Sequence, residues 1–300
     1  MLNIDIEDLL AQYRLGVNIV NKLKLDNPGH SSQDVAKFVE ISYDIQSGSY
    51  VAAARKKDSF REKYSKEIIE HLKDLDFANV LEIGCGEATT LANVTMLLGR
   101  KLSRVSGFDI SLSRLFHADE FFKEKNPNSK FDLFCADMFN IPLADNSFDL
   151  VYSSHSLEPN GGRELEAINE LYRVAGKYLL LIEPYYEMAS DEGKARMDSH
   201  GYVKDLVGSI KKLGLDLVSH GLFACSANIN NPTGYFLIRK NAGTLPNARF
   251  RCPISHSELS FKNNFLFSKK GGYVYPVINS IPCLKKENGI LASHFEFFCK

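Results

Sequence analysis

Apolar side chains follow a helical spacing in the first quarter of the chain. They recur every three or four residues, as expected for a helix with one buried face, at Leu9, Leu10, Tyr13, Val17 and Val20. A turn-rich run at 27–30 interrupts the pattern, and further helices are predicted from Ser32 and from about residue 51 to 73. Residues 1–73 are therefore predicted to form an N-terminal helical cap.

From Asn79 the pattern changes to short apolar runs that alternate with helical segments. This alternation is typical of a parallel sheet covered by helices on both faces. Strands are predicted at 80–83, 105–109, 131–135, 150–153 and 178–183. Helices are predicted between them at about 89–98, 111–125 and 163–174, with a longer one at about 194–213.

Two further apolar runs, at 215–224 and 234–240, are joined only by a turn-rich connection, which predicts an antiparallel hairpin at one sheet edge. The predicted fold of residues 74–241 is thus α/β, a doubly wound, Rossmann-like sheet of seven mostly parallel strands. In residues 242–300, turns such as Cys252-Pro253 and Gly271-Gly272 surround short β runs and predict a small β appendage.

Composition and charge narrow the class of protein. With 44% hydrophobic and 24% charged residues among 300, the chain is expected to be globular. The 36 Lys and Arg against 37 Asp and Glu give a net charge of -1, which disfavours nucleic acid as a partner. An acidic N-terminus and the lack of a long apolar run predict a cytoplasmic protein without membrane insertion. The six cysteines contain no C-x-x-C pair and are expected to stay reduced.

A glycine turn, Gly84-Cys85-Gly86, joins the first strand to the helix that follows it. Such a turn lets the backbone approach a ligand, and the open amides of the helix favour an anionic group there. The alternative is a plain strand-to-helix turn. A dinucleotide fingerprint would need glycine at Thr89, which argues against a nicotinamide oxidoreductase.

Two acidic residues follow the next two strands. Asp109 could accept two hydrogen bonds from a ribose diol, and Asp137 could accept from an exocyclic adenine amine while Met138 or Phe139 packs on the ring. Each acid alone could equally be a helix N-cap. At the carboxyl ends of successive strands, the two together are typical of a nucleoside site.

These motifs, with the run from Ile141 to Val151, resemble in order those of class I S-adenosylmethionine-dependent methyltransferases, over roughly residues 65–240. The resemblance implies S-adenosylmethionine as cofactor and S-adenosylhomocysteine as product. It implies that Asp109 takes the ribose, that Asp137 takes the adenine, and that the cofactor site comprises Glu82, Gly84, Cys85, Gly86, Asp109, Ile110, Asp137, Met138, Phe139 and Ser154. Ala88 departs from the family pattern, which usually has a third glycine there.

The methyl acceptor is expected beyond the fourth and fifth strands, at the open end of the sheet. His155 is the first candidate for proton removal, since its ordinary pKa is near 6.5; it could instead pack against the cofactor and orient a loop. His200 is a second candidate base, with a solvated histidine as the alternative. The predicted substrate contacts are Tyr43, Tyr50, His155, Glu158, Asn160, Glu183 and Tyr185, although Glu183 could cap a helix and the first two tyrosines could simply pack.

The two flanking regions are also interpreted by resemblance. Related methyltransferases place an N-terminal helical segment over the cofactor as a lid. The tail resembles small zinc-ribbon domains that accompany or activate some methyltransferases, but Ser255, Ser268 and Gly271 stand where cysteine ligands would be needed. No metal is expected, and the tail is interpreted as a relic with a structural or dimer-forming use.

The sequence therefore predicts methyl transfer to an oxygen or nitrogen of a small polar metabolite. An analogy of fold favours a sugar or related building block of a bacterial surface polysaccharide as the acceptor. A quinone-like lipid precursor or a peptide is the alternative acceptor, and a non-catalytic cofactor-binding or activating subunit is the alternative function. The oligomeric state is left open, with a homodimer as one candidate.

Overall fold

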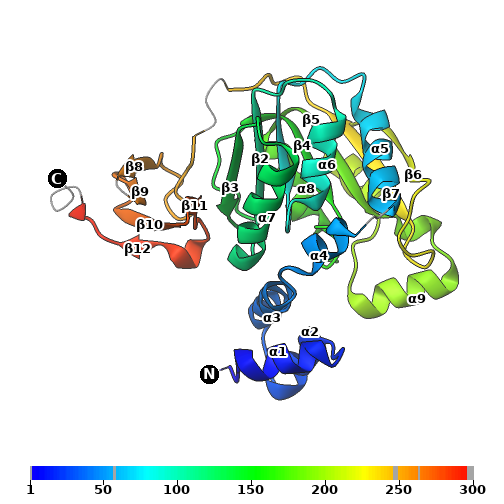
Figure 1. Cartoon of the computed structure of the whole chain (residues 1–300), viewed down its shortest axis with the longest axis horizontal. Helices are drawn as coiled ribbons and strands as arrows, with labels where there is room; N and C mark the ends of the chain where they lie inside the picture. Colours follow the sequence, from blue (N-terminus) through cyan, green and yellow to red (C-terminus); the bar gives the residue numbers. More distant parts are fainter. Residues whose placement is uncertain (1, 57–58, 246–248, 263, 296–300) are drawn as a thin grey trace.

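The structure is a computed structural model that describes residues 2–56, 59–245, 249–262 and 264–295 (Figure 1). Cys299 and the end of the predicted β appendage lie outside the described residues. In Figure 1 the helices α1, α2 and α3 lie together below the large sheet, α5 lies beside the sheet at the right, and the C-terminal strands lie beyond β3, at the left. No helix of the described residues is long and apolar enough to cross a membrane.

Five helices precede the first strand: α1 (Ile6–Arg14), α2 (Ile19–Asp26), α3 (Ser32–Ile45), α4 (Ser49–Arg55) and α5 (Ser59–Leu72). Helices α1–α3 share a small core of their own, which includes Leu9, Leu23 and Phe38. The helical pattern expected up to residue 26 is divided in two, because Gly16 has a φ of +81° and the side chain of Asn18 caps the start of α2.

The large sheet has seven strands: β1 (Asn79–Ile83), β2 (Arg104–Asp109), β3 (Phe131–Cys135), β4 (Phe148–Ser154), β5 (Ala175–Pro184), β6 (Asp216–Leu222) and β7 (Thr233–Arg239). Their order is β3-β2-β1-β4-β5-β7-β6. Strand β7 runs antiparallel to β5 and β6, and the other neighbouring pairs are parallel. The predicted fold class, a mostly parallel seven-stranded sheet, is confirmed.

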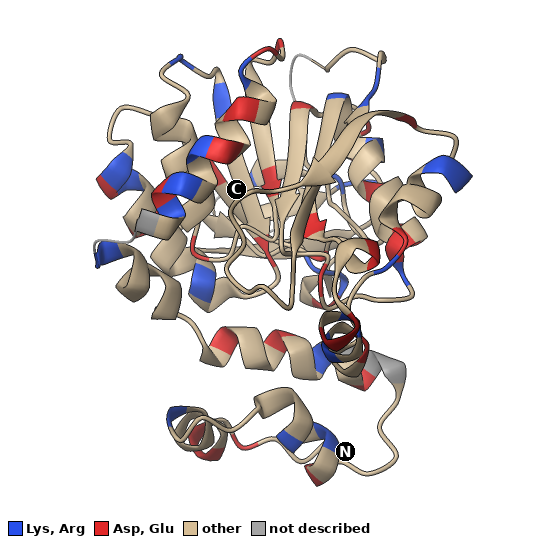
Figure 2. Cartoon of the chain, turned by 90° about the vertical axis from the view of Figure 1, so that its right-hand side faces the viewer, with Lys and Arg blue, Asp and Glu red and all other residues tan. Residues whose placement is uncertain are grey.

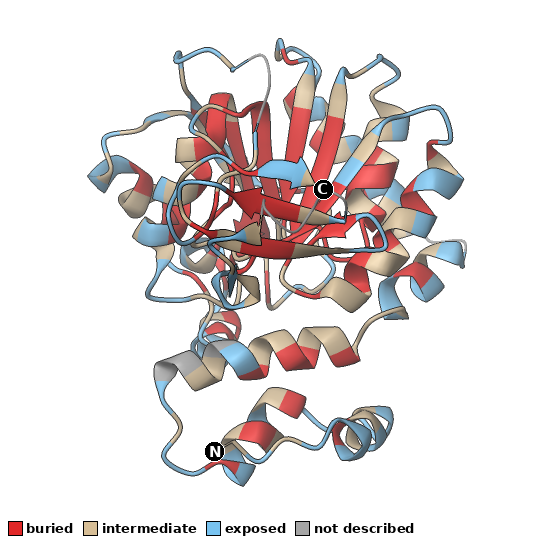
Figure 3. Ribbon diagram, turned by 90° about the vertical axis from the view of Figure 1, so that its left-hand side faces the viewer, coloured by how far each residue is buried: buried red, intermediate tan, exposed pale blue. Residues whose placement is uncertain are grey.

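Helices cover both faces of this sheet: α6 (Thr89–Leu97), α7 (Leu112–Lys125), α8 (Glu164–Val174) and α10 (Leu206–Lys212). Helix α9 (Asp191–His200) follows β5 and packs on the short turn at Tyr186–Met188. Val80 joins the core under α5, α6 and α7, while Leu81 joins the core under α8 and α10. This alternation puts successive side chains of β1 on opposite faces. Figure 3 shows the strands of the large sheet coloured mostly as buried, and Figure 2 shows Lys and Arg positions interspersed with Asp and Glu positions along the ribbon.

The prediction of a single long helix at about 194–213 is wrong. The chain forms α9 and α10 instead, separated by an extended segment. Gly201 ends α9 in the left-handed region with a φ of +67°. Asp205 then starts α10 by accepting a hydrogen bond from the amide of Gly208. Two capping residues therefore divide a pattern that was apolar enough to suggest one helix.

The C-terminal unit is a second, smaller sheet: β8 (Ser260–Lys262), β9 (Phe265–Ser268), β10 (Tyr273–Ile278), β11 (Ile281–Pro282) and β12 (Ile290–Leu291). Its order is β11-β10-β9-β8, with β12 on β10, and its pairings are antiparallel. Cys252, Leu266 and Tyr275 form its buried centre. We call residues 249–295 the C-terminal unit below.

Candidate active site

The glycine turn lies at the carboxyl end of β1, between β2 and β4. Gly84 has a φ of +60°, and a side chain there would overlap the Cβ of Ser156 in the loop after β4. Gly86 has a φ of +53°. Ala88, where a third glycine was expected, also adopts a left-handed conformation, with a φ of +52°. The turn therefore needs glycine at Gly84 for space as well as for backbone conformation.

Asp109 is fixed against this turn. Its carboxylate accepts hydrogen bonds from the amide of Gly86 at 2.9 Å and from the amide of Ser111 at 2.9 Å. Burial raises the pKa of Asp109, although the Arg114 charge and these two bonds oppose the rise. A carboxylate offers about four acceptor positions, so two remain for a diol. Asp109, the residue predicted to bind the ribose, is thus held in place beside the glycine turn.

Buried polar atoms without hydrogen-bond partners among the described residues gather near the turn. They include Oε2 of Glu82, Oγ of Ser156, and Nε and Nη2 of Arg114. Burial raises the pKa of Glu82 well above its usual value. Because buried polar groups are normally satisfied, these atoms fit a site built to take a polar ligand, as the cofactor would be.

The predicted adenine residues lie at the end of β3. Asp137 accepts a hydrogen bond from the amide of Phe139 at 3.0 Å, and burial raises its pKa. The Arg163 guanidinium lies over the Phe139 ring, 3.3 Å from its centroid. Ile110 is next to Asp109 in sequence, and its carbonyl accepts a hydrogen bond from the Cys135 thiol at 3.3 Å. The ends of β2 and β3 are thereby tied together.

The segment that joins α3 to α4 covers this end of the sheet. Glu87, in the glycine turn, accepts hydrogen bonds from the amides of Gly48 at 2.9 Å and Val51 at 2.6 Å. Asp44 accepts bonds from the hydroxyls of Ser111 at 2.6 Å and Ser113 at 2.9 Å. We call α3, α4 and their connection the lid. Its carboxylate contacts attach it directly to the loops that follow β1 and β2.

The two predicted lid tyrosines converge on one cation. The Arg114 guanidinium lies 5.1 Å from the ring centroid of Tyr43 and 4.6 Å from that of Tyr50. Its Nε is 4.0 Å from the Glu87 carboxylate. Burial raises the pKa of Tyr43, so this phenol stays neutral. Tyr43 and Tyr50 therefore lie at the glycine turn, next to the loops expected to hold the cofactor.

His155 lies at the carboxyl end of β4 with a φ of +54°, which is unusual for histidine. Its Nδ1 is 2.6 Å from the Glu158 carboxylate, and its Nε2 is 3.0 Å from the Thr233 hydroxyl. Burial lowers the pKa of His155, but the hydrogen bond and charge of Glu158 outweigh it, so the pKa is raised overall. Beside it, the Ser154 hydroxyl is 2.8 Å from the Tyr64 hydroxyl.

Glu183, at the end of β5, binds the backbone of the loop that follows β4 and carries His155. It is fully buried and accepts hydrogen bonds from the amides of Ser156, Leu157 and Glu158 at 3.1 to 3.2 Å. Burial raises its pKa to about 7, with the His155 charge opposing the rise. The carboxyl predicted as a substrate contact thus positions the loop that carries His155 and Glu158.

Asn160 belongs to this arrangement, because it donates to the carbonyls of Ser156 and Leu157 and so closes the same loop. Two other predicted residues lie outside it. Tyr185 packs on Phe236, and its hydroxyl is 2.9 Å from Nδ1 of His220 on β6. His200 is exposed at the end of α9, where Nδ1 lies 2.8 Å from the Arg196 carbonyl. The structure brings neither Tyr185 nor His200 to His155.

Sequence reasoning missed Glu87, Arg114, Tyr64 and Thr233. Glu87 could have been identified from its position within the glycine turn, because a carboxylate there needs hydrogen-bond donors. Thr233 contacts a residue 78 positions earlier, and Tyr64 contacts Ser154 across 90 positions. No local pattern could have found these two contacts.

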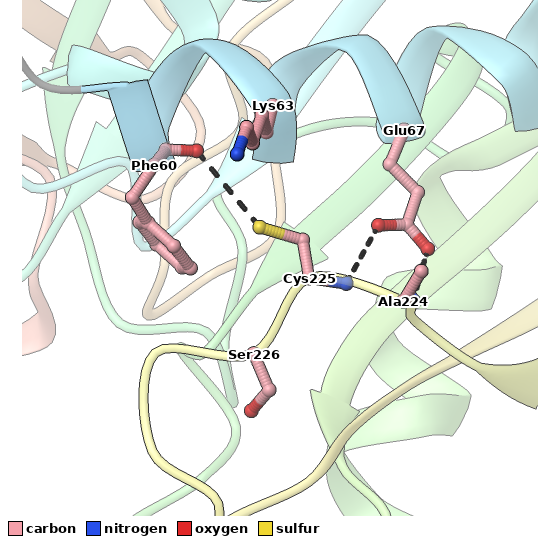
Figure 4. A pocket seen from close by; sticks show the side chains of 6 residues that line it. All are labelled: Phe60, Lys63, Glu67, Ala224, Cys225 and Ser226. Atoms are coloured by element: carbon pink, nitrogen blue, oxygen red, sulfur yellow. Dashed lines mark hydrogen bonds between the residues drawn. The ribbon is translucent and has the colours of Figure 1, made fainter.

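A surface pocket of about 430 Å³ lies between α5 and the connection after β6 (Figure 4). It is lined by Phe60, Lys63, Glu67, Ala224, Cys225 and Ser226. Glu67 accepts hydrogen bonds from the amides of Ala224 and Cys225, which fixes that connection to α5. The ring of Phe60 stacks on that of Tyr64, with 5.8 Å between the ring centroids, and Tyr64 contacts Ser154 at the end of β4. The pocket therefore adjoins the ends of β4 and β5, where the methyl acceptor is expected; we call this the acceptor end of the sheet.

In the C-terminal unit, the positions compared above with zinc-ribbon ligands lie close together. The Ser255 and Ser268 hydroxyls are 3.4 Å apart, and Ser257 joins both, at 2.8 and 2.5 Å. Gly271 donates its amide to Ser268 at 2.9 Å. Within the described part of the chain, no group of three or more His, Cys, Asp or Glu could hold a metal ion. Hydroxyl hydrogen bonds therefore link these positions.

Residues 80–177 match the model of a protein family described as "Methyltransferase domain". Three solved structures illustrate the fold. The first is a complex of a methyltransferase activator with a putative methyltransferase from Haloferax volcanii, with a TM-score of 0.50, 12% identity, and coverage of 66% of this chain and 96% of that chain. The second is the cyclase SpnF, with a TM-score of 0.49, 16% identity, and coverage of 61% of this chain and 81% of that chain. The third is magnesium protoporphyrin IX methyltransferase from Synechocystis with bound SAH, with a TM-score of 0.47, 15% identity, and coverage of 60% of this chain and 84% of that chain. No curated protein matches the chain.

These findings confirm the coarser part of the sequence prediction. Residues 80–177 match a methyltransferase domain, in agreement with the predicted methyl donor, S-adenosylmethionine, and its product, S-adenosylhomocysteine. The structures are less than 25% identical, so they speak for the fold alone. The acceptor and the zinc-ribbon character of the tail stay predictions.

Proposed function

We propose that this chain transfers a methyl group to an oxygen or nitrogen of a small polar metabolite. The observation that carries the proposal is the pair of arrangements on either side of β1, namely Asp109 bonded to the glycine turn and His155 held by Glu158. When bound, S-adenosylmethionine supplies a methyl group on a sulfonium that needs no acid to leave. The protein is then left to orient the acceptor and remove one proton.

We assign the cofactor contacts to the ends of β1, β2 and β3. Asp109 would hold the ribose, Asp137 with Met138 the adenine, and the turn from Glu82 to Gly86 the methionine part. Ser154, bonded to Tyr64, lies where the fourth strand ends and would border the transferred methyl group. Lid residues Tyr43 and Tyr50 would exclude water from this end.

We assign proton removal to His155. The Glu158 carboxylate orients the ring and stabilises its cationic form, an arrangement that suits a base which must accept a proton. Glu183 acts as a positioning residue, since it binds the backbone of the loop and not the acceptor. His200 would take no part, because it is exposed away from this group.

A sugar or related building block of a bacterial surface polysaccharide is our preferred acceptor. What supports it is the polar character of the acceptor end, where hydroxyl, carboxyl and imidazole groups meet. A quinone-like lipid precursor or a peptide is the alternative. A cytoplasmic location and a homodimer complete the proposal. A non-catalytic cofactor-binding subunit is the rival function, and it predicts binding of S-adenosylhomocysteine without turnover of any acceptor.

The test starts with mass spectrometry of small molecules that co-purify with the chain. A methyl-transfer screen against nucleotide sugars, lipid precursors and peptides follows. Replacement of Glu158 by Gln should lower the pKa of His155, so the rise of kcat/KM with pH should move to lower pH. His155→Gln should abolish that dependence and reduce kcat by about a hundredfold. Turnover within a few-fold of the parent in His155→Gln would remove His155 from proton transfer.

A further inference from the structure

The C-terminal unit docks on the outer edge of β3, the last strand of the large sheet. The Leu284 amide donates to the Cys135 carbonyl at 2.7 Å, and Cys135 and Cys283 form a parallel bridge. At a second point, the Asn140 side chain donates to the Pro253 carbonyl at 3.0 Å. The unit thus covers an otherwise open sheet edge. It also contacts both ends of the loop after β3, at Cys135 and at Asn140.

This docking point lies beside the predicted cofactor residues. Cys135 is the last residue of β3, two positions before Asp137, and its thiol donates to the Ile110 carbonyl. The segment at 283–285 therefore runs past the ends of β2 and β3 together. A residue of that segment is placed to influence the adenosine end of the site.

Lys285 leaves this segment and reaches the lid. Its Nζ is 2.6 Å from Glu40 in α3, a residue 245 positions earlier. The Lys285 side chain is 9% exposed and that of Glu40 is 15% exposed, so the pair is largely shielded from water. Lys37 and Glu287 lie farther away, at 3.0 Å from Glu40 and 3.5 Å from Lys285. When one partner is removed, Glu40 keeps its ion pair with Lys37 and Lys285 keeps its contact with Glu287, but the bond that joins the lid to the C-terminal unit is lost.

Glu40 and Asp44 are four residues apart and so lie on one face of α3. Asp44 binds the loop after β2, Glu87 binds the start of α4, and Glu40 binds the C-terminal unit. Helix α3 also belongs to the separate small core of α1–α3. Its attachment to the rest of the protein therefore depends strongly on these carboxylates.

We propose that Lys285 is a positioning residue that ties the lid to the C-terminal unit and holds the lid closed over the cofactor end of the sheet. Affinity for the cofactor product then depends on a residue that belongs to neither the lid nor the methyltransferase domain. The identity of the ligand rests on the proposed function. The ion pair and its effect on the lid do not.

The experiment compares the full-length parent with Lys285→Met, which keeps the apolar stem and removes the charge, and with Glu40→Gln. Lys270→Met is the matched control, because Lys270 is exposed in the same unit. Calorimetric titration with S-adenosylhomocysteine should show about tenfold weaker binding in both test variants and unchanged binding in the control. Amide hydrogen exchange in α3 should accelerate in the two test variants, while exchange in β9 and β10 stays slow.

A pair that serves only to stabilise the C-terminal unit gives a different result. Lys285→Met would then speed exchange in β9 and β10 and leave both α3 exchange and affinity within twofold of the parent, and this outcome would overturn the proposal. The exchanged pair Glu40→Lys with Lys285→Glu should recover part of the loss beyond either single reversal. If Lys285→Met does not fold, Glu40→Gln tests the same bond from the lid. If the parent binds no S-adenosylhomocysteine, the proposed function fails, and α3 exchange still decides the question.

Discussion

The cofactor end and the acceptor end of the sheet are built from carboxylates that have different partners. At the cofactor end, Asp109 and Glu87 accept from backbone amides. At the acceptor end, Glu158 binds a titratable ring, and Glu183 carries a pKa of about 7. The first end therefore has its shape fixed by carboxylates bonded to the backbone, whereas the second pairs a carboxylate with an imidazole that can take up a proton. The difference suits binding at one end and proton transfer at the other.

The largest expected effect concerns the shape of the cofactor end. Gly84→Ala should lower the free energy of unfolding by about 4 kcal/mol, since a left-handed alanine costs about 1 and the overlap with Ser156 adds about 3. Gly162→Ala is the control, because Gly162 has a φ of +88° with no atom near its Cβ position. It should lose only about 1 kcal/mol. Equal losses in urea denaturation would show that the close approach to Ser156 carries no weight.

The next effect concerns the charge of the acceptor end. Burial raises the pKa of Glu183 to about 7, whereas the unfolded chain ionises it near 4.5. Between these values the folded state holds a proton that the unfolded state has lost, so stability falls as pH rises. The fall should total about 3 kcal/mol from pH 4.5 to 7 and should be largely absent in Glu183→Gln. Parallel urea midpoints for parent and variant over this range would contradict the assignment.

A smaller effect is expected at Asp44, which attaches the lid to the loop after β2. Asp44→Ala removes two hydroxyl hydrogen bonds to the loop after β2. Each bond to a charged group contributes about 1.5 kcal/mol or more, and part of that is recovered by water. We expect about tenfold weaker binding of S-adenosylhomocysteine in calorimetry, with little change in melting temperature. Unchanged affinity would mean that this anchor is dispensable for closure.

The smallest effect is expected at His200. Its side chain is exposed, so His200→Ala should change the unfolding free energy by less than about 0.5 kcal/mol and leave turnover within twofold. A hundredfold loss of kcat would return His200 to the list of catalytic candidates and would require α9 to move toward His155.

The sequence located the glycine turn, Asp109 and Asp137 at the ends of their strands, but it did not locate the partners of His155 and Ser154, for a physical reason. The glycine turn, Asp109 and Asp137 are contiguous with the strands that carry them, so local pattern contains both the residue and its place. The partners of His155 and Ser154 come from β7 and α5, which only tertiary packing brings near. Capping at Gly201 and Asp205, which split a predicted helix, and the docking of residues 283–285 on β3 likewise depend on local or distant geometry that hydrophobic spacing does not encode.

The most direct measurement of the whole account is calorimetric titration of S-adenosylhomocysteine into the parent chain and into Asp109→Asn. The account predicts one site per chain in the parent. It predicts affinity about a hundredfold weaker in the variant, because a charged acceptor of two ribose hydroxyls is lost. Binding that is absent in the parent, or equally tight in both proteins, would contradict the placement of the adenosyl ligand at the ends of β1 and β2.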